Sequence, residues 1–320
     1  MVSLARPSSM DLSNNPLAVI TRYLFESIGI VSVDVFVMIS GWFLVKTRTK
    51  SVLSFLYQIF FFWGGGYLIM LLTGNAELSV KGLFTCFSFT SWDWFIKAYL
   101  VLFIISPILN TFIQSTSEKV MRNVIIWFFV FMCTYGWIGG ASRFFVGGYG
   151  PLSFIGLYLL SNYAHNAKDN IDVPIFIKRL FCFDKYVDLS IFLTTVVLNT
   201  IVGIFALKWG IDIYSLIYAY INPLVIIGAL YFLLFFSKLE IKQSQIINWL
   251  AASSFSVYLL HSQINIRPFF TEHIQKIYEM HNGISVVGMI ALYLVIVYII
   301  SVLIDQIRII TWNCLSKNIK

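Results

Sequence analysis

The sequence predicts an all-α fold, a polytopic bundle of about nine transmembrane helices, and three observations support this. The 320-residue chain is 59% hydrophobic and 12% charged, whereas soluble globular chains are about 45–50% apolar and about 25% charged. Its mean hydropathy is +0.83. Apolar stretches of about 20 residues, the length that one helix needs to cross a bilayer, recur along the chain. A soluble protein is excluded, and so is a transmembrane barrel, because the stretches do not alternate polar and apolar residues.

The apolar stretches place the predicted spans in order along the chain. The spans are 24–45, 52–72, 95–113, 123–138, 151–164, 189–207, 216–236, 248–266 and 284–304. Alternate connections collect Lys and Arg, as cytoplasmic loops do. They hold fourteen of the 22 basic residues: Lys46, Arg48, Lys50, Lys119, Arg122, Lys168, Lys178, Arg179, Lys185, Lys238, Lys242, Arg308, Lys317 and Lys320.

This charge bias predicts a multi-pass protein of the cytoplasmic (inner) membrane with its C-terminus in the cytoplasm. The net charge of +7 is then explained by topology, and no nucleic-acid partner is expected. Residues 1–23 form an extracytoplasmic polar segment with neither the apolar core of a signal peptide nor an anchor. Either a further helix belongs upstream of this segment, or a short polar tail crosses unaided when the first helix inserts.

We expect residues 1–320 to form one integral membrane domain. The longest polar connection, 165–188, has basic residues around an apolar patch, which favours a cytoplasmic interfacial helix. The outer segment GWIGGASRFFVGGYGP (136–151) is rich in glycine. It either folds back over a cavity or is a flexible connector.

Asp34 is the clearest polar residue at a costly position. It lies ten residues into the first predicted span, about 15 Å deep by helical rise, and Ser27 and Gly41 share its helical face. A carboxylate there costs at least about 2.5 kcal/mol on insertion scales. We expect it either to face a water-filled interior or to pair with a basic side chain on a neighbouring helix.

The eighth predicted span carries a polar stripe at helical spacing. It consists of Ser254, Tyr258, His261 and Asn265. Because an aligned polar face should avoid lipid, we expect it to line a cavity, although a buried histidine is often only structural. Two weaker stripes include Tyr99 with Asn110, and Tyr218 with Asn222 beside Pro223, where we expect a kink.

Familiar soluble-enzyme motifs are absent from the sequence. There is no phosphate-binding loop, no His-Glu-x-x-His pair and no Gly-x-Ser-x-Gly elbow. The four cysteines lie far apart and form no Cys-x-x-Cys pair. We therefore expect no metal site and no bound cofactor.

Three stretches of the sequence carry recognisable patterns. VSVDVFVMISGWFLV has an acid, an aromatic run and a Ser-Gly-aromatic signature, with Asp34, Ser40, Gly41, Trp42 and Phe43. WFIKAYLVLFIISPILN has the pattern of Trp94, Tyr99, Ser106, Pro107 and Asn110, and SSFSVYLLHS has the pattern of Ser254, Phe255, Tyr258 and His261. Together, in this order, the three stretches resemble the acyltransferase family 3 membrane proteins, which O-acylate surface sugars. GGYGPLSFIGLYLLSNY is also similar to a segment of that family.

The resemblance implies a bacterial membrane O-acyltransferase, most often an O-acetyltransferase. The group would move from acyl-CoA, the donor substrate, to a hydroxyl of a cell-surface polysaccharide, exopolysaccharide or lipid-linked sugar, and membrane lipid surrounds the enzyme. The family has a ten-helix core whose first helix carries an essential Arg and His, and this sequence begins after that helix. The resemblance then leaves two alternatives, a late-called start or a truncated, inactive homologue.

In the family interpretation, the histidine of that first helix is the base and Asp34 is a supporting carboxylate. His261 and Tyr258 line the acceptor or acyl side. The substrate-binding candidates are Ser40, Gly41, Trp94, Tyr99, Asn110, Arg143, Ser254 and Tyr258, and the catalytic candidates are Asp34 and His261. The main competing function is a carrier or flippase for a polysaccharide intermediate, against which stands the absence of an inverted repeat.

Overall fold

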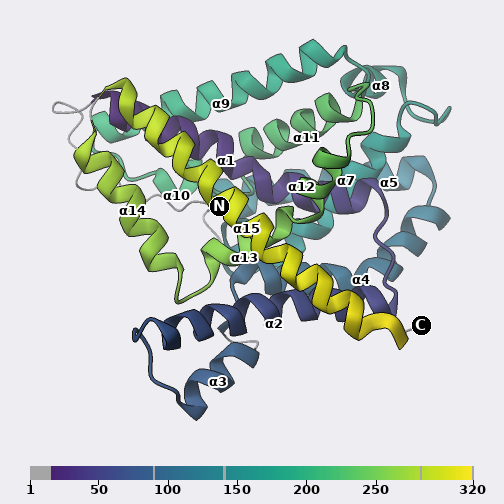
Figure 1. The fold of residues 1–320 in the computed structure, drawn as a ribbon. Coiled ribbons are helices and arrows are strands. Elements are labelled where there is room, and N and C mark those ends of the chain that lie inside the picture. Colours follow the sequence, from purple (N-terminus) through teal and green to yellow (C-terminus); the bar gives the residue numbers. More distant parts are fainter. Residues whose placement is uncertain (1–15, 89–90, 140–141, 282, 319–320) are drawn as a thin grey trace. The chain divides into compact units, whose positions relative to one another are not determined.

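The computed structural model describes residues 16–88, 91–139, 142–281 and 283–318, and within these ranges it contains helices and no strand. In this part of the chain, six helical segments are long and apolar enough to cross a membrane. They are α1 (Pro16–Trp42), α2 (Thr49–Leu72), α4 (Trp94–Ser115), α5 with its π-helical continuation (Glu118–Ile138), α9 (Lys185–Lys208) and α15 (Ile284–Leu315). The prediction of an all-α membrane bundle is confirmed (Figure 1).

Shorter helices complete the described chain. They are α3 (Val80–Phe87), α6 (Ser142–Phe145), α7 (Pro151–Asn166), α8 (Ile175–Phe181), α10 (Tyr214–Ile217), α11 (Pro223–Ser237), α12 (Gln245–Ala252), α13 (Ser254–Ser262) and α14 (Arg267–Met280). Most of the predicted polar segment 1–23 lies outside the described residues, and α1 already begins at Pro16.

The predicted span 248–266 is wrong as a single helix. Helix α12 ends at Ala252, Ser253 has φ −103° and ψ 7°, and α13 runs only from Ser254 to Ser262. The Gln263 side chain then accepts hydrogen bonds from the backbone N–H groups of Asn265 (2.7 Å) and Ile266 (3.0 Å). Such local side-chain bonds compete with helix formation. Asn265 therefore lies in a turn and leaves the predicted stripe.

Pro223 begins a helix instead of kinking one. It occupies the first turn of α11, where its missing N–H costs nothing. Asn222 caps that helix by accepting a hydrogen bond from the N–H of Leu224 at 3.0 Å. The predicted span 216–236 is thus split between the short α10 and α11.

The contacts divide the chain into two compact units, each described here by itself. Unit 1 comprises residues 1–21, 47–93 and 241–320, and unit 2 comprises residues 22–46 and 94–240. In unit 1, α13 packs against α2 and α15. In unit 2, α9 lies beside α11 (Figure 1), and α7 packs against α4 and α5.

The connection 165–188 contains a short helix, as its composition predicts. In α8, Ile177 is buried in a hydrophobic cluster with Met121 and Ile125 of α5. Ile175 and Phe176 on the same helix are 72% and 69% exposed. The helix therefore has one face on the protein and another free to meet an interfacial layer.

Candidate active site

Asp34 lies on the buried face of α1 within unit 2. Ser27 and Asp34 are both 0% exposed, and Gly41 is buried as well, so the predicted shared face is confirmed. Neither carboxyl oxygen of Asp34 has a hydrogen-bond partner among the described residues. A buried carboxyl without a partner is costly, which makes this position a candidate for interaction with a ligand or a mobile cation.

Gly41 brings α1 close to α7. A Cβ atom at this position would collide with the backbone carbonyl of Tyr158 and with Ser161 Oγ. The Asn162 side chain donates a hydrogen bond to the Gly41 carbonyl at 3.2 Å. The signature glycine is therefore required by close helix packing, and the family resemblance located a real structural contact.

Four of the predicted binding residues gather in unit 2. Ser40 Oγ lies 2.9 Å from the hydroxyl of Tyr99. Asn110 accepts a hydrogen bond from the Tyr158 hydroxyl at 2.6 Å and donates one to the Val45 carbonyl at 3.0 Å. With Gly41 nearby through Tyr158, these residues form one polar group between α1, α4 and α7.

Trp94 lies in an aromatic environment away from this polar group. Trp94, at the opposite end of α4 from Asn110, packs against Tyr149, Phe154 and Tyr220 at ring-centroid distances of 4.4, 6.2 and 5.1 Å. The backbone of Arg143 belongs to α6, and its side chain lies outside the described part of the chain.

His261 occupies a defined environment in unit 1. Its side chain is 9% exposed, and Nδ1 lies 2.6 Å from the Val257 carbonyl oxygen. Because a carbonyl oxygen only accepts, Nδ1 carries the proton in the neutral ring, and Nε2 holds the basic lone pair. In this tautomer the neutral ring takes up a further proton at Nε2.

Tyr258 connects His261 to an acidic residue. Its ring lies edge-on to the His261 ring at 5.8 Å, and its hydroxyl donates a hydrogen bond to Asp93 Oδ1 at 2.5 Å. Asp93 precedes α4 and was not singled out by the sequence analysis. The Trp-Asp-Trp run at 92–94 is the signal that could have indicated it.

The prediction that Ser254 belongs to the buried polar stripe is wrong. Ser254 is exposed, whereas Ser253 and Ser256 are 0% exposed. Ser254, Tyr258 and His261 all lie in α13, so their helical spacing holds, but Ser254 is the first residue of that helix and its side chain is exposed there. Ser256 instead lies 2.5 Å from the Ser253 carbonyl and 3.2 Å from the Ser301 carbonyl, and donates to both.

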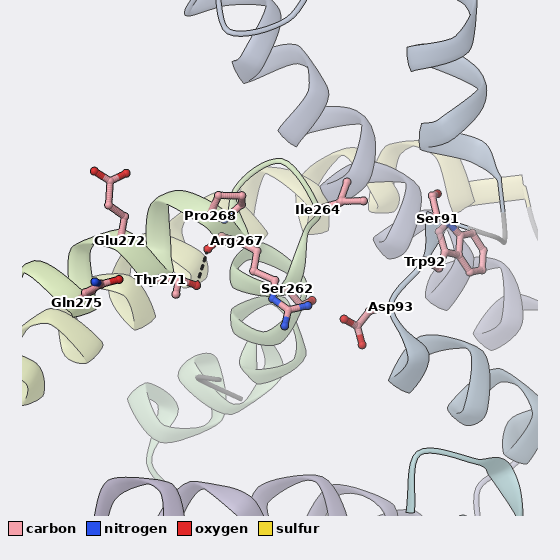
Figure 2. Close-up of a pocket in the computed structure, with 10 residues that line it drawn as sticks. All are labelled: Ser91, Trp92, Asp93, Ser262, Ile264, Arg267, Pro268, Thr271, Glu272 and Gln275. Carbon is pink, nitrogen blue, oxygen red and sulfur yellow. Dashed lines mark hydrogen bonds between the residues drawn. The ribbon is translucent and has the colours of Figure 1, made fainter. Parts of the chain in front are cut away.

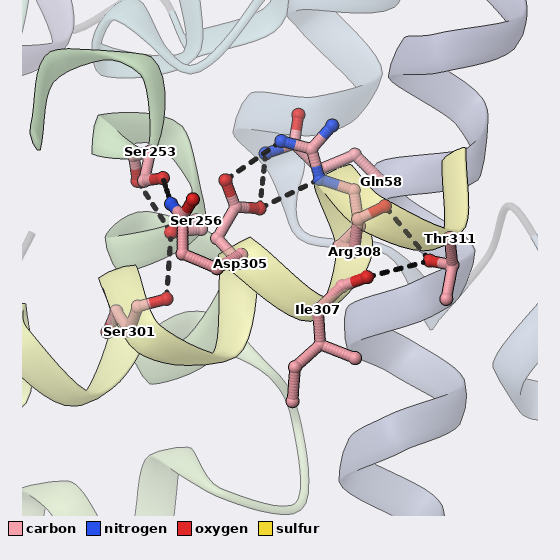
Figure 3. Close-up of polar contacts among 9 residues, drawn as sticks. Gln58, Ser253, Ser256, Ser301, Asp305, Ile307, Arg308 and Thr311 are labelled. Carbon is pink, nitrogen blue, oxygen red and sulfur yellow. Dashed lines mark hydrogen bonds and ion pairs between the residues drawn. The ribbon is translucent and has the colours of Figure 1, made fainter. Parts of the chain in front are cut away.

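A buried ion pair in unit 1 was also missed. Arg308 donates to both carboxyl oxygens of Asp305 at 2.8 Å, and the Gln58 amide lies 3.4 Å from Asp305 (Figure 3). The predicted span ended at 304, and Arg308 was assigned to a loop, but α15 continues to Leu315. The i, i+3 spacing of an acid and a base was the available signal.

The structure therefore divides the candidates into two groups. Asp34, Ser40, Gly41, Tyr99 and Asn110 belong to unit 2, whereas Tyr258 and His261 belong to unit 1. That Asp34 and His261 share a chamber stays a prediction. Among the described residues, no group of three or more His, Cys, Asp or Glu side chains could hold a metal ion.

Comparison with known proteins identifies the family of this chain. No curated protein and no solved structure matches the chain. A scan of protein families matches residues 4–306 to the family described as an acyltransferase domain, which covers nearly the whole chain and all the candidate residues. With its apolar helices, its Ser-Gly-aromatic contact at α1 and its buried histidine on α13, the chain belongs to the acyltransferase family 3 of membrane proteins.

Proposed function

We propose that this protein is a membrane O-acyltransferase that moves an acyl group, most simply acetyl, from acyl-CoA to a hydroxyl of a bacterial surface polysaccharide or its lipid-linked precursor. The acyltransferase domain supports the reaction class. The observation that carries the proposal for this chain is the buried His261, whose Nδ1 is engaged by the Val257 carbonyl and whose Nε2 can accept a proton.

The proposed transfer requires proton movement and charge stabilisation. The acceptor oxygen attacks the thioester carbonyl carbon, a C–O bond forms, and the C–S bond breaks. The hydroxyl proton passes to a base, for which His261 Nε2 is suited, and the CoA thiolate leaves and takes up a proton. Asp34 is proposed as the supporting carboxylate, because it is buried and has no hydrogen-bond partner within the described residues.

The proposed orientation keeps the polyanionic donor on the cytoplasmic side. Lys50 Nζ lies 3.5 Å from the Ser316 carbonyl, so the beginning of α2 and the end of α15 are on one side of unit 1. In unit 2, Lys238 contacts the Phe183 carbonyl at 2.9 Å. Both contacts join segments that charge counting assigns to the cytoplasm, which supports an inner-membrane protein with a cytoplasmic C-terminus.

The proposal is tested with purified protein in lipid nanodiscs, labelled acetyl-CoA and surface polysaccharide or lipid-linked sugar. We expect acyl transfer by the wild type and a loss of about 10²–10⁴-fold in His261→Ala, the range for a positioned proton-transfer group. His273→Ala is the matched control, because His273 is an exposed histidine of α14. Both variants should insert and unfold like the wild type.

Two results would contradict the proposal. Undiminished transfer in His261→Ala would show that this residue takes no part in the reaction, although the protein would still be an acyltransferase. Acceptor movement across the membrane without acylation would instead support the carrier function.

A further inference from the structure

Unit 1 contains a pocket that none of the candidate residues lines. Its volume is about 560 Å³, within the range of small-molecule sites. It lies between the segment 91–93, which precedes α4, and the junction of α13 with α14 (Figure 2). Charge counting assigns both segments to the extracytoplasmic side, which is the side of a surface glycan.

The pocket presents hydrogen-bonding groups of opposite character. Asp93 and Arg267 point toward each other across it, with Ser262 beside the guanidinium group (Figure 2). Within the described chain no ion pair joins Arg267 to a carboxylate. The Ser262 hydroxyl is buried, and no described group bonds to it. A ligand hydroxyl placed here can donate to Asp93 while it accepts from Arg267.

The pocket also has an aromatic wall. Trp92 is 2% exposed and is held edge-on against Phe60 at 5.5 Å. At this exposure only a small part of the indole reaches the pocket, and the ring is a fixed apolar part of its wall. A small apolar area beside a hydrogen-bond donor and acceptors suits a sugar ring, whose rim is made of hydroxyl groups.

The charge of the lining argues against an anionic ligand. The lining holds one cation, Arg267, and two carboxylates, those of Asp93 and Glu272. The nearest added cation, Lys276, lies 2.6 Å from Glu272 and pairs with it. The pocket therefore has no surplus positive charge to offset the phosphates of coenzyme A or the carboxylate of an acidic sugar.

We propose that this pocket binds a neutral, hydroxyl-rich sugar unit of the acceptor, with Asp93, Arg267 and Ser262 as its hydrogen-bonding groups and Trp92 as a fixed part of its wall. This inference rests on the proposed function. The pocket adjoins the His261 site, because Asp93 holds the Tyr258 hydroxyl and Ser262 follows His261 in the chain. A sugar bound there extends from the outer surface toward the imidazole.

Binding is measured by saturation-transfer NMR on the full chain in nanodiscs, a method that needs no acyl transfer. The probes are the methyl β-glycosides of glucose, galactose and N-acetylglucosamine, methyl β-glucuronide as the acidic sugar, and acetyl-CoA. We expect a neutral glycoside to bind at millimolar concentration, and Arg267→Gln and Asp93→Asn each to weaken it by about tenfold or more, because each removes a charged hydrogen-bonding group.

Lys276→Gln is the matched control, since it removes one positive charge from the same helix outside the pocket lining. It should leave neutral-glycoside binding within about twofold, as an exposed ion pair contributes little. Arg267 is exposed, so its replacement should not disturb folding. The inference is overturned if no neutral glycoside binds, or if both pocket variants bind the neutral glycosides as tightly as the wild type does. It is also overturned if the variants change the affinity for the glucuronide or acetyl-CoA alone.

Transfer assays separate failure of this inference from failure of the proposed function. Acyl transfer with an unchanged acceptor KM in Arg267→Gln would support the acyltransferase function and would show that the pocket is not the acceptor site. Glycoside binding that responds to the pocket variants, in a wild-type protein with no transfer, would keep the pocket and reject the enzyme.

Discussion

Two buried aspartates, one in each unit, occupy long apolar helices and differ in what surrounds them. Asp305 on α15 is 0% exposed and receives two hydrogen bonds from Arg308, with Gln58 at 3.4 Å. Asp34 on α1 is also 0% exposed, but its oxygens have no hydrogen-bond partner among the described residues. Asp305 therefore has a satisfied environment, and Asp34 has an unsatisfied one.

This difference distinguishes a buried carboxylate with a structural role from one that is available for a reaction. A buried ion pair with bidentate geometry compensates its own desolvation and has no capacity left for a substrate. A buried carboxyl without compensation costs free energy, which evolution tolerates where function requires it. The unsatisfied position is thus the better functional candidate, and the following experiments test this distinction in order of expected effect.

The largest effect is expected from breaking the pair at Asp305. Arg308→Ala should lower the free energy of unfolding by about 3–5 kcal/mol, because it leaves a buried carboxylate unpaired. Denaturation in mixed micelles measures this. The double variant Asp305→Leu with Arg308→Met should recover most of the loss, since apolar replacement of a whole pair is often neutral. A double variant as unstable as the single one would contradict the pairing argument.

Asp34→Asn should affect activity and leave stability alone. No described partner is lost, so the free energy of unfolding should change by no more than about 0.5 kcal/mol. Acyl transfer should fall by about 10²-fold if the charged carboxylate supports the reaction. A strongly destabilised variant would show that Asp34 is structural and would remove its contrast with Asp305.

Gln58→Leu tests how much the hydrogen bond from Gln58 to Asp305 contributes to stability. The amide lies at 3.4 Å from Oδ1, a long hydrogen bond that adds to two short ones. We expect a loss of about 1 kcal/mol in unfolding free energy and no change in acyl transfer. A loss as large as that of Arg308→Ala would mean that Arg308 alone does not satisfy Asp305.

The smallest effect is expected at the exposed ion pair of Glu272 and Lys276. Lys276, 2.6 Å away on α14, holds the pKa of the exposed Glu272 below its ordinary value of 4.5. The pair therefore stabilises above pH 4.5 and loses its contribution as the pH falls through the lowered pKa. In Lys276→Gln, NMR titration should show the Glu272 pKa moving up, with no measurable change in unfolding at neutral pH. An unmoved pKa would place its cause elsewhere.

The membrane-helical class, the family and several contacts follow from local sequence. Hydropathy runs of membrane-spanning length locate the long helices, and the signature around Ser40 and Gly41 marks a place where α1 and α7 touch. The sequence patterns did not indicate Tyr158 and Asn162, because their hydrogen-bond partners lie more than 40 residues away in the sequence. Periodicity along one helix carries no information about such partners.

The sequence by itself determined that the chain lies in a membrane as helices, since burial of backbone polar groups in lipid permits little else. It also determined the family and the identity of the costly residues Asp34 and His261. Only the tertiary structure decided that α13 ends before Asn265, that Ser254 is exposed, and that Asp305 is paired with Arg308 while Asp34 has no hydrogen-bond partner among the described residues. The reason is physical, because whether a buried charge is compensated depends on side chains from other turns and other helices, and folding alone brings these together.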